Sequence, residues 1–369
     1  MLRILVLNLG GTSTKIAIFE DRMMIEEANI HHPREVSQQF PLAMEQIGYR
    51  KEVILKWLSE QALTMDDFDC FALRGGSLDY TQKGGTYRIN HVAIRECQRK
   101  LQESPGFYHG TQIVITLALA LDDGRNLPIF ITDPPNVNEL VAEAKIAGHP
   151  SFERVPVFHV LNTKAVGRKI MTDVGQEYER SDLVICHMGA GVSVSAHHRG
   201  RIIDANNCIN GEGPMSANRV GQLPMKQLIQ RCFHSQYTEE QILRLIRQEG
   251  GVKAHLGTAD MRKVQTMVEE GDEKATLIVD AFVWQIAKAI GSYVAVLDGQ
   301  VDAIILTGGI AHSQLINQKI TQKVQCFAPV LIYPGELESE GLALGAYRAM
   351  TGEIEAIDYQ DPTIEAVLS

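Results

Sequence analysis

Two glycine-containing turns, each set between apolar strands, are the segments of this chain best suited to binding phosphate. The first turn, 8–13, separates the apolar runs 4–7 and 15–19, and the second turn, 187–191, is flanked by apolar runs in the same way. Glycine lets backbone N–H groups approach an anion, and successive amides in a tight turn form an anion-binding concavity. Two such turns, one in each half of the chain, can face each other across a cleft and hold a polyphosphate. This pattern predicts a nucleotide-dependent phosphotransferase.

The side chains in and beside these turns are of the types that phosphate binding uses. Small hydroxyls and glycines lie beside a lysine in the first turn, and a histidine precedes two glycines in the second. A third motif, 308–310, follows an apolar strand and precedes a helix, and helix starts at strand ends favour anions. The predicted nucleotide-binding residues are Asn8, Gly10, Gly11, Thr12, Ser13, Lys15, His187, Gly189, Gly191, Gly308, Gly309 and Ile310. Taken singly, each motif is equally typical of an ordinary hairpin or strand–helix turn.

The elements that must position these motifs alternate between strands and helices. In the first half we expect strands near 3–7, 15–20, 23–29, 69–74 and 128–132, and helices near 49–62, 91–103, 110–121 and 137–147. In the second half we expect strands near 155–160, 183–188, 192–198, 201–205, 301–307 and 329–333, and helices near 162–177, 222–234, 238–248, 272–298, 313–325 and 339–351. A chain of 369 residues is too long for one compact core and fits two domains. The acidic tail after Gly352 is expected to fray.

Composition argues against several classes of partner. The net charge is −10 and no block of Lys or Arg stands out, whereas nucleic acids and anionic membranes need a basic surface. A single ATP needs only local positive charge and a metal. Six scattered cysteines without CxxC spacing indicate reduced thiols in a cytoplasmic protein. The apolar segment 113–121 is too short to span a membrane, and we interpret 272–298 as a core helix.

Together the three glycine motifs resemble those of the acetate and sugar kinase, heat-shock ATPase and actin superfamily. Ordered motifs along nearly the whole chain are similar to its acetate kinase branch, and most similar to butyrate kinases. These motifs are NLGGTSTKIAIFE at 8–20, LRGGSL at 73–78, KGGTYRIN at 83–90, ITDPPNVNE at 131–139, VFHVLNTKAVGR at 157–168, ICHMGAGVSVSAHHRGRIIDANN at 185–207, GEGPMSANRVGQLP at 211–224, LGTADMRKV at 256–264, ILTGGIAHS at 305–313 and APVLIYPGELESEGLALGA at 328–346.

The resemblance implies an α/β fold of two ribonuclease H-like domains, as in actin-like ATPases, with a nucleotide-binding cleft between them. We expect an N-terminal domain over 1–155, joined by the C-terminal helix 339–369, and a C-terminal domain with an adenosine-binding part over 156–338. The implied activity is that of a butyrate kinase, which reversibly transfers the ATP γ-phosphoryl group to the carboxylate of butyrate or a similar short-chain fatty acid. ATP/ADP and Mg²⁺ are the implied cofactors, and a homodimer or larger homo-oligomer is the implied assembly.

Four residues match the family's catalytic positions, namely Arg74, Asp133, His159 and Arg219. An acid and a polyphosphate are both anions, so the site needs fixed positive charge, and arginine forks onto carboxylate or phosphate oxygens. A carboxylate is already deprotonated at neutral pH, so no general base is required and Asp133 is assigned to positioning the metal and nucleophile. By residue type alone, a loop arginine is more often a solvated surface residue, and a strand-end histidine is more often a satisfied core residue.

The resemblance also implies the metal and adenosine contacts. The predicted magnesium shell is Asn8, Asp133 and Glu340, and the predicted adenosine contacts are Asp260, Met261 and Arg262. A simpler alternative for Glu340 is the acidic first turn of helix 339–351, which the helix dipole favours. The simpler alternative for Met261 is an ordinary core side chain.

Some residues depart from the butyrate kinase pattern and keep other functions open. Gly11 stands where a hydroxyl residue is usual, and Gln112 replaces an asparagine within the altered segment 109–115. We interpret these changes as a shift in substrate preference or turnover, so a kinase for a branched-chain fatty acid, acetate or propionate is one alternative. A catalytically weakened nucleotide-binding regulatory protein is another. A sugar kinase fits less well, because paired arginines suit a carboxylate better than a hydroxyl.

Overall fold

The chain forms two units. The computed structural model describes residues 1–10, 13–33, 40, 43–75, 78, 81, 83–103, 110–234 and 236–360. Unit 1 comprises 1–137 and 337–369, and unit 2 comprises 138–336. The segment 138–155, which precedes the predicted boundary, bonds to unit 2: the Val141 amide donates to the Ile203 carbonyl, and Arg154 forms an ion pair with Asp204.

Unit 1 is built on a seven-stranded sheet in the order β12-β5-β6-β4-β1-β2-β3. Three strands form an antiparallel meander: β1 (Arg3–Leu9), β2 (Ser13–Glu20) and β3 (Met23–His31). β4 (Cys70–Arg74) runs parallel to β1, and β6 (Ile129–Thr132) runs parallel to β4. β5 (Thr86–Arg88) and β12 (Ile357–Asp358) complete the other edge. The parallel strands read as continuous apolar runs because helices cover both faces.

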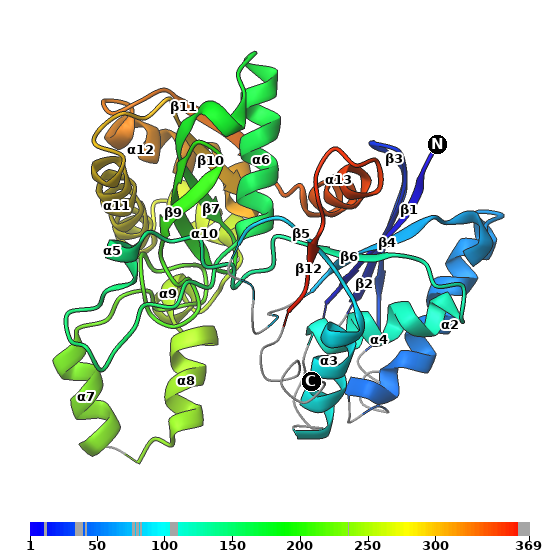
Figure 1. Cartoon of the computed structure of the whole chain (residues 1–369). Coiled ribbons are helices and arrows are strands. Elements are labelled where there is room, and N and C mark those ends of the chain that lie inside the picture. The colour runs from blue at the N-terminus through cyan, green and yellow to red at the C-terminus, as the bar shows by residue number, and fades with distance from the viewer. Residues whose placement is uncertain are drawn as a thin grey trace. The chain divides into compact units, whose positions relative to one another are not determined.

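The helices of unit 1 lie on both faces of this sheet (Figure 1). α13 (Glu338–Met350) covers one face, against β1, β4 and β6. α2 (Gln46–Glu60), α3 (His91–Glu103) and α4 (Gly110–Asp122) cover the other, with short 3₁₀ turns η1 (Ala43–Glu45) and η2 (Met65–Asp67) beside α2. Gly345 allows α13 its close approach, because an added Cβ would lie 2.1 Å from the Thr132 hydroxyl.

Unit 2 is built on a five-stranded sheet in the order β11-β10-β7-β8-β9. β7 (Asp182–Met188), β8 (Val192–His198) and β9 (Arg201–Ala205) form an antiparallel meander. β10 (Ala303–Gly308) runs parallel to β7, and β11 (Val330–Pro334) runs parallel to β10. Each unit therefore repeats the same five-strand core, a meander followed by two strands parallel to its first strand. This repeat confirms the predicted mixed α/β fold with two sheets.

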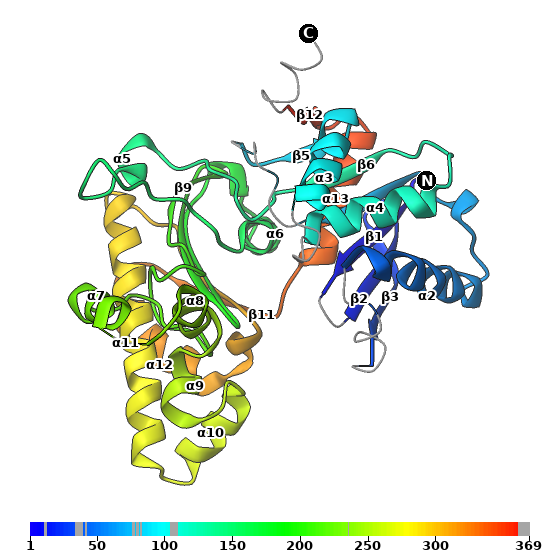
Figure 2. The same ribbon diagram turned by 90° about the horizontal axis from the view of Figure 1, so that it is seen from below.

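Figures 1 and 2 show α6 (Val160–Asp173) on one side of the unit 2 sheet and α11 (Glu273–Val296) with α12 (Gln314–Val324) on the other. The smaller helical elements are α5 (Ala142–Lys145), η3 (Tyr178–Arg180), α7 (Met225–His234), α8 (Glu239–Gln248), α9 (Gly251–Leu256), α10 (Met261–Glu269) and η4 (Gly309–His312). Among the described residues, α11 is the one helix whose length and apolar composition would let it cross a membrane. Its apolar side chains Phe282, Ile286 and Ile290 are buried in the core of unit 2.

Three expected elements differ from the structure. The predicted helix 137–147 is reduced to the single turn α5, because Val141 is extended and its amide donates to the Ile203 carbonyl of β9 instead of continuing a helix. The predicted strand 155–160 is not a strand, because its carbonyls accept hydrogen bonds from the loop residues Asn207 and Cys208 instead of a neighbouring strand. The tail was expected to fray after Gly352, but its described part instead forms β12 on the unit 1 sheet, and Tyr359 beyond it is buried. Residues 361–369 of this tail lie outside the described residues.

Candidate functional site

The first glycine turn closes on itself between β1 and β2. The Gly10 amide donates to the Ser13 carbonyl at 2.9 Å, and Leu9 and Thr14 form the last strand pair before the turn. A Cβ at Gly10 would lie 2.9 Å from the Ser13 hydroxyl, so glycine permits this narrow turn. The predicted Gly11 and Thr12 lie outside the described residues. Lys15 lies further along β2, where its ammonium group is 2.9 Å from the Glu27 carboxylate of β3.

A carboxylate at the start of α13 joins two of the predicted residues of unit 1. The Asn8 side-chain amide donates to Glu338 Oε2 at 2.9 Å, and Arg74 Nη2 lies 2.8 Å from Glu338 Oε1. Asn8 and Arg74 are register partners on the adjacent strands β1 and β4. The Arg74 side chain remains 40% exposed while that of Glu338 is 11% exposed. The guanidinium is therefore oriented by a buried carboxylate and still has N–H groups that face solvent.

Glu338 was not among the residues predicted from the sequence, which named Glu340 of the same helical turn as a magnesium ligand. The two residues lie in the first turn of the same helix, and the structure brings Glu338 to Asn8 and Arg74. Glu340 is half-buried in that turn. Its place in a magnesium shell stays a prediction.

Asp133 lies at the end of β6 in a backbone conformation that is unusual for a residue with a side chain. Its φ is +45°, in the left-handed region, and the residue is only 4% exposed. The Gly85 amide donates to Asp133 Oδ1 at 2.8 Å, and the Asp133 amide donates to the Gly85 carbonyl at 2.9 Å. Aspartate tolerates positive φ better than most residues, yet strained residues of this kind cluster at active sites. The structure therefore fixes the Asp133 carboxylate on the Gly85 amide, and its role in positioning metal and nucleophile stays a prediction.

The second glycine turn is also closed by a backbone hydrogen bond. The Gly189 amide donates to the Gly191 carbonyl at 2.9 Å between β7 and β8. His187 is buried at the end of β7, and its Nε2 lies 3.2 Å from the position that a Cβ of Gly189 would take. The imidazole therefore borders the turn that is predicted to bind phosphate.

The two predicted histidines stack on each other. The rings of His159 and His187 are 3.8 Å apart with an angle of 17° between their planes. Asn162 Nδ2 donates to His187 Nδ1 at 2.9 Å, which fixes the tautomer of a neutral His187 with its proton on Nε2. His159, just before α6, shares a 2.8 Å hydrogen bond through Nδ1 with the Ser193 hydroxyl. His187 Nε2–H thus points toward the second turn as a donor, 3.5 Å from the Glu336 carboxylate.

Arg219 lies directly against the second turn. A Cβ at Gly191 would be 2.2 Å from Arg219 Nη1, so only glycine leaves room for the guanidinium. Nη1 donates to the Cys208 carbonyl at 3.0 Å and lies 3.5 Å from its sulfur. The Arg219 loop is also tied to the turn, because Ser216 donates to the Ala190 carbonyl and accepts from the Arg219 amide. Arg219 is therefore a fixed residue of the turn rather than a solvated loop arginine.

The third motif is a close packing of strand ends. Gly308 has φ +89°, and a Cβ there would lie 2.5 Å from the Met188 carbonyl, while Gly309 has open space around it. Ile310 is buried in η4.

Asp260 caps α10 by accepting from the Arg262 amide, and this carboxylate also pairs with the exposed Arg262 guanidinium, which lowers the pKa of Asp260. Met261 is 9% exposed and lies in the unit 2 core, which is also the position of an ordinary core side chain. Adenosine contacts by 260–262 stay a prediction.

A metal ion would have to rely on few protein ligands. Within the described residues, no three His, Cys, Asp or Glu side chains gather as a metal cage. The predicted ligands Asn8, Asp133 and Glu340 are nonetheless oxygen donors, and Mg²⁺ favours one or two carboxylates together with waters and substrate phosphates. This donor set fits an ion that arrives with a nucleotide.

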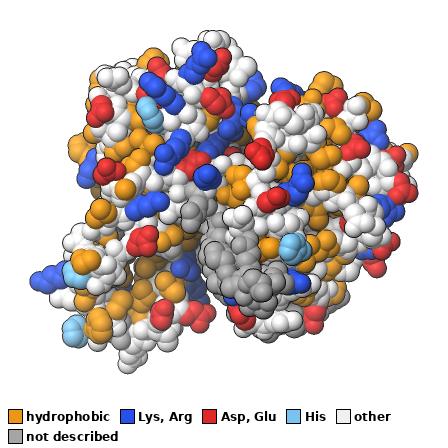
Figure 3. Space-filling model, viewed as in Figure 1, with side chains coloured by type: hydrophobic (Ala, Val, Ile, Leu, Met, Phe, Trp, Pro, Cys, Tyr) orange, Lys and Arg blue, Asp and Glu red, His pale blue; other side chains and the backbone are white. Residues whose placement is uncertain are grey.

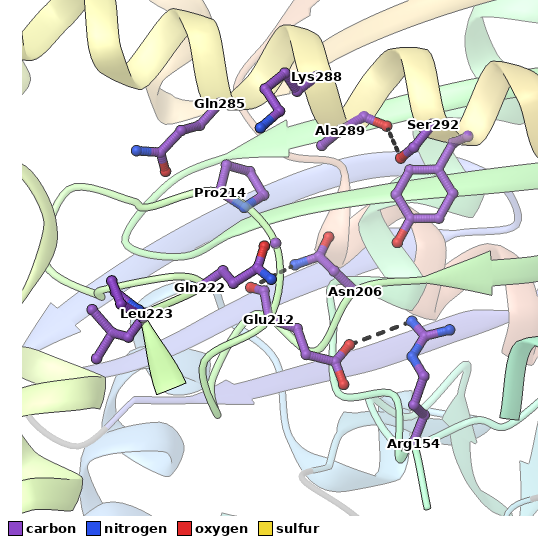
Figure 4. A pocket seen from close by; sticks show the side chains of 13 residues that line it. Arg154, Asn206, Glu212, Pro214, Gln222, Leu223, Gln285, Lys288, Ala289 and Ser292 are labelled. Atoms are coloured by element: carbon purple, nitrogen blue, oxygen red, sulfur yellow. Dashed lines mark hydrogen bonds and ion pairs between the residues drawn. The ribbon is translucent and has the colours of Figure 1, made fainter. Parts of the chain in front are cut away.

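Unit 2 also contains a cavity of about 640 Å³ between the 212–224 loop and α11 (Figure 4). Several of its polar side chains already form hydrogen bonds with other residues of unit 2. Four N–H groups of Arg154 donate to the carbonyls of Ala144 and Ala205 and to the carboxylates of Asp204 and Glu212. Gln285 accepts from the Met215 amide. The cavity contains none of the predicted site residues, and it is not the candidate site.

Residues that sequence reasoning missed hold the predicted ones in place. They are Asn162, Ser193, Cys208, Ser216 and Glu338. Asn162 had a detectable signal, because it lies one helical turn after His159. The others contact the site only through tertiary structure.

Comparison with known proteins gives the fold a context. A model of the acetokinase family matches residues 154–331, less than half of the 369-residue chain. The acetate kinase of Porphyromonas gingivalis has a similar structure, with a TM-score of 0.77 and 17% identity, over 95% of this chain and 99% of that one. The acetate kinase of Entamoeba histolytica gives 0.75 and 16% identity over 93% and 98% of the two chains. A propionate kinase of Francisella tularensis gives 0.72 and 16% identity over 94% and 99%. At such identities these likenesses show that the chain shares the fold of these proteins.

Proposed function

We propose that this protein is a butyrate kinase that transfers the γ-phosphoryl group of ATP to the carboxylate of butyrate or a similar short-chain fatty acid. One observation carries the proposal. The second glycine turn has a guanidinium, Arg219, and an oriented imidazole N–H, His187, directly beside its backbone amides. These are the donors that a transferring phosphoryl group needs, and they are already held by other residues. The match of 154–331 to the acetokinase family supports the same chemistry.

The proposed reaction is a direct in-line displacement. A carboxylate oxygen of the acid attacks the γ-phosphorus, the bond to the β–γ bridging oxygen breaks, and ADP leaves with that electron pair. No proton has to be removed from the acid, so catalysis consists of positioning and charge neutralisation. We assign neutralisation of the transferred group to Arg219 and His187, with His159 supporting the His187 ring. We assign orientation of the acid to Arg74.

Unit 1 supplies the remaining groups of the proposal. Asp133 positions the nucleophile and the metal, and Asn8 and Glu340 complete the proposed shell of Mg²⁺, which would supply charge neutralisation on the phosphates when bound. Asp133 suits this task because its carboxylate is fixed by the Gly85 amide.

The identity of the acid rests on the sequence motifs. The three similar structures given above are named as acetate or propionate kinases, so a kinase for either acid, or for a branched-chain acid, is the nearest alternative. A regulatory protein that binds nucleotide without transfer is the second alternative. Retention of Arg74, Asp133, His159 and Arg219 favours an active enzyme.

We also propose a homo-oligomeric, cytoplasmic protein. α7 buries none of its residues, and Met225, Ile229 and Phe233 place 74%, 50% and 79% exposed apolar side chains on one face of this helix. Figure 3 shows hydrophobic side chains on the visible surface of unit 2 where α7 and α8 lie. A second copy of the chain is the occupant we propose for this face, and sedimentation of wild type against Phe233→Asp tests it.

The cysteines Cys70, Cys97, Cys186 and Cys208 are buried free thiols, as a reducing compartment permits.

The test of the proposed activity is hydroxamate trapping of acyl phosphate. The protein is incubated with ATP, Mg²⁺ and, in turn, acetate, propionate, butyrate, isobutyrate, valerate or isovalerate. We expect the highest kcat/KM with butyrate. A maximum with another acid would replace the substrate and keep the reaction class. ATP binding without acyl phosphate from any acid would support the regulatory alternative.

A further inference from the structure

An arginine lies buried beneath the first glycine turn. Arg50, on α2, is 1% exposed and is the largest fully buried side chain in the described part of the chain. A buried arginine is costly unless its N–H groups are bonded, so the fold has to supply acceptors for it. Those acceptors come mainly from the turn between β1 and β2.

The guanidinium bonds to both ends of that turn. Nη2 donates to the Gly10 carbonyl at 3.0 Å, and Nη1 donates to the Ser13 carbonyl at 3.0 Å and to the Thr14 hydroxyl at 2.7 Å. Gln46, one turn earlier on α2, accepts from Nε at 3.2 Å and from Nη2 at 3.1 Å. The planar guanidinium thereby fixes the spacing of the Gly10 and Ser13 carbonyls, and Gln46 of the same helix orients it.

A second layer holds Thr14. Its hydroxyl accepts from Arg50 and shares a 2.8 Å hydrogen bond with His32 Nε2, and His32 Nδ1 lies 3.3 Å from the Tyr49 hydroxyl. Burial, together with the nearby Arg50 charge, lowers the pKa of His32. His32 is therefore neutral at pH 7 and places no second cation beside the guanidinium.

These contacts have a consequence for anion binding. A carbonyl oxygen carries partial negative charge and repels a phosphate oxygen. A loop carbonyl that is bonded to a buried guanidinium cannot turn toward a bound phosphate. Hydrogen bonds to a charged group are stronger than neutral ones, so they hold the Gly10 and Ser13 carbonyls in place.

We propose that Arg50 is a positioning residue that holds the two ends of the first glycine turn, Gly10 and Ser13, where they bind the nucleotide phosphates. The proposal rests on the proposed function only in taking ATP as the ligand. Arg50 acts through Gly10, Ser13 and Thr14 and does not itself touch the nucleotide.

Calorimetric titration of the full chain with MgATP and, separately, with adenosine tests this role. Adenosine lacks the phosphates, so a residue that orders the phosphate turn changes ATP affinity alone. For Arg50→Met we expect the Kd for MgATP to rise about tenfold or more, the equivalent of losing one such hydrogen bond. The Kd for adenosine should stay within about twofold. Arg50→Lys keeps the charge but not the fork and should give an intermediate rise.

Lys51→Met is the matched control. Lys51 is the next residue of α2, and its ammonium donates to the Ala120 carbonyl instead of the turn. We expect its affinities for both ligands to equal those of wild type. Should Arg50→Met not fold, Arg50→Lys and Thr14→Val, which removes one acceptor, decide the matter.

Two results would overturn the role of Arg50. One is an unchanged Kd for MgATP in the folded variants, and the other is equal weakening of ATP and adenosine, which indicates general destabilisation. Failure of the proposed function is distinguishable. Wild type that binds MgATP but forms no acyl phosphate refutes carboxylate kinase activity and leaves the titration of the variants intact.

Discussion

Replacing Gly191 by alanine tests whether Arg219 must lie against the second glycine turn. The added Cβ would be 2.2 Å from Arg219 Nη1 and 3.1 Å from Cζ, distances at which the guanidinium has to move. The nearest other atom is the Cys208 sulfur at 3.4 Å, an ordinary contact. The guanidinium is the far end of a flexible side chain, so it retreats while the backbone stays in place.

The expected cost falls on catalysis and spares the fold. To reach van der Waals distance, Nη1 has to withdraw by about 1 Å or more, and a misplacement of that size costs about 100-fold in rate. Loss of one preorganised donor costs about 100- to 1,000-fold in kcat, or about 2.7–4 kcal/mol of transition-state stabilisation. The hydrogen bond to the Cys208 carbonyl weakens, which costs about 1 kcal/mol of folding free energy and is partly offset by the lower entropy of alanine in the unfolded chain.

The assay is kcat by hydroxamate trapping, with urea unfolding as the check on stability. Gly291→Ala on α11 is the control, because its added Cβ would meet Phe327 at an ordinary 3.7 Å. The double variant Gly191→Ala/Arg219→Ala should be no slower than Arg219→Ala alone, since both changes remove the same interaction. A Gly191→Ala enzyme with kcat within about threefold of wild type would refute the reasoning, as would an additive double variant.

Three further changes follow from the site and the core. Asp133→Asn should fold normally, because asparagine also tolerates a positive φ and its side-chain oxygen still accepts from the Gly85 amide. Its kcat should fall about 100-fold or more. Normal kcat with normal urea stability would remove Asp133 from the mechanism. Asn162→Ala removes the donor that fixes the His187 tautomer, so kcat should fall about tenfold while urea stability stays near that of wild type, and a kcat within about twofold of wild type would contradict the tautomer assignment. Burial keeps the pKa of His197 well below 6.5, so the unfolded chain binds a proton that the folded protein does not. The free energy of unfolding should therefore fall as the pH drops below about 6.5, by up to about 1.4 kcal/mol per pH unit, and His197→Gln should flatten this slope in urea titrations at pH 7 and 5.5.

Local pattern was sufficient for most of the core. The apolar runs at 4–7 and 183–186 are β1 and β7 because parallel central strands are buried on both faces and need continuous apolar sequence. The long amphipathic run 272–298 is α11, capped by Asp272 as helix-start chemistry favours. The edge strand β12 was not predicted, because the strand with which it pairs is far away in the sequence. β12 is only Ile357–Asp358, and its stability comes from pairing with β5, more than 260 residues earlier.

The site was predictable where a residue type and a turn coincide, and hidden where tertiary contacts decide. Arg219 is a loop arginine by sequence, and its fixed position comes from Cys208 and Ser216 together with the missing side chain of Gly191. Glu338 and Glu340 are indistinguishable by type and spacing, because both start the same helix. Only the packing of α13 on β1 and β4 selects Glu338 as the partner of Asn8 and Arg74.

The central claim is that a carboxylate oxygen attacks the γ-phosphorus of ATP. Phosphorus-31 NMR of the wild-type protein with MgATP and butyrate labelled with ¹⁸O in its carboxylate observes this bond directly. The proposal predicts an acyl phosphate resonance that carries the isotope shift of one bridging ¹⁸O, with ADP formed in equal amount. ADP appearing with unlabelled inorganic phosphate and no acyl phosphate would contradict it, because that result is ATP hydrolysis by water.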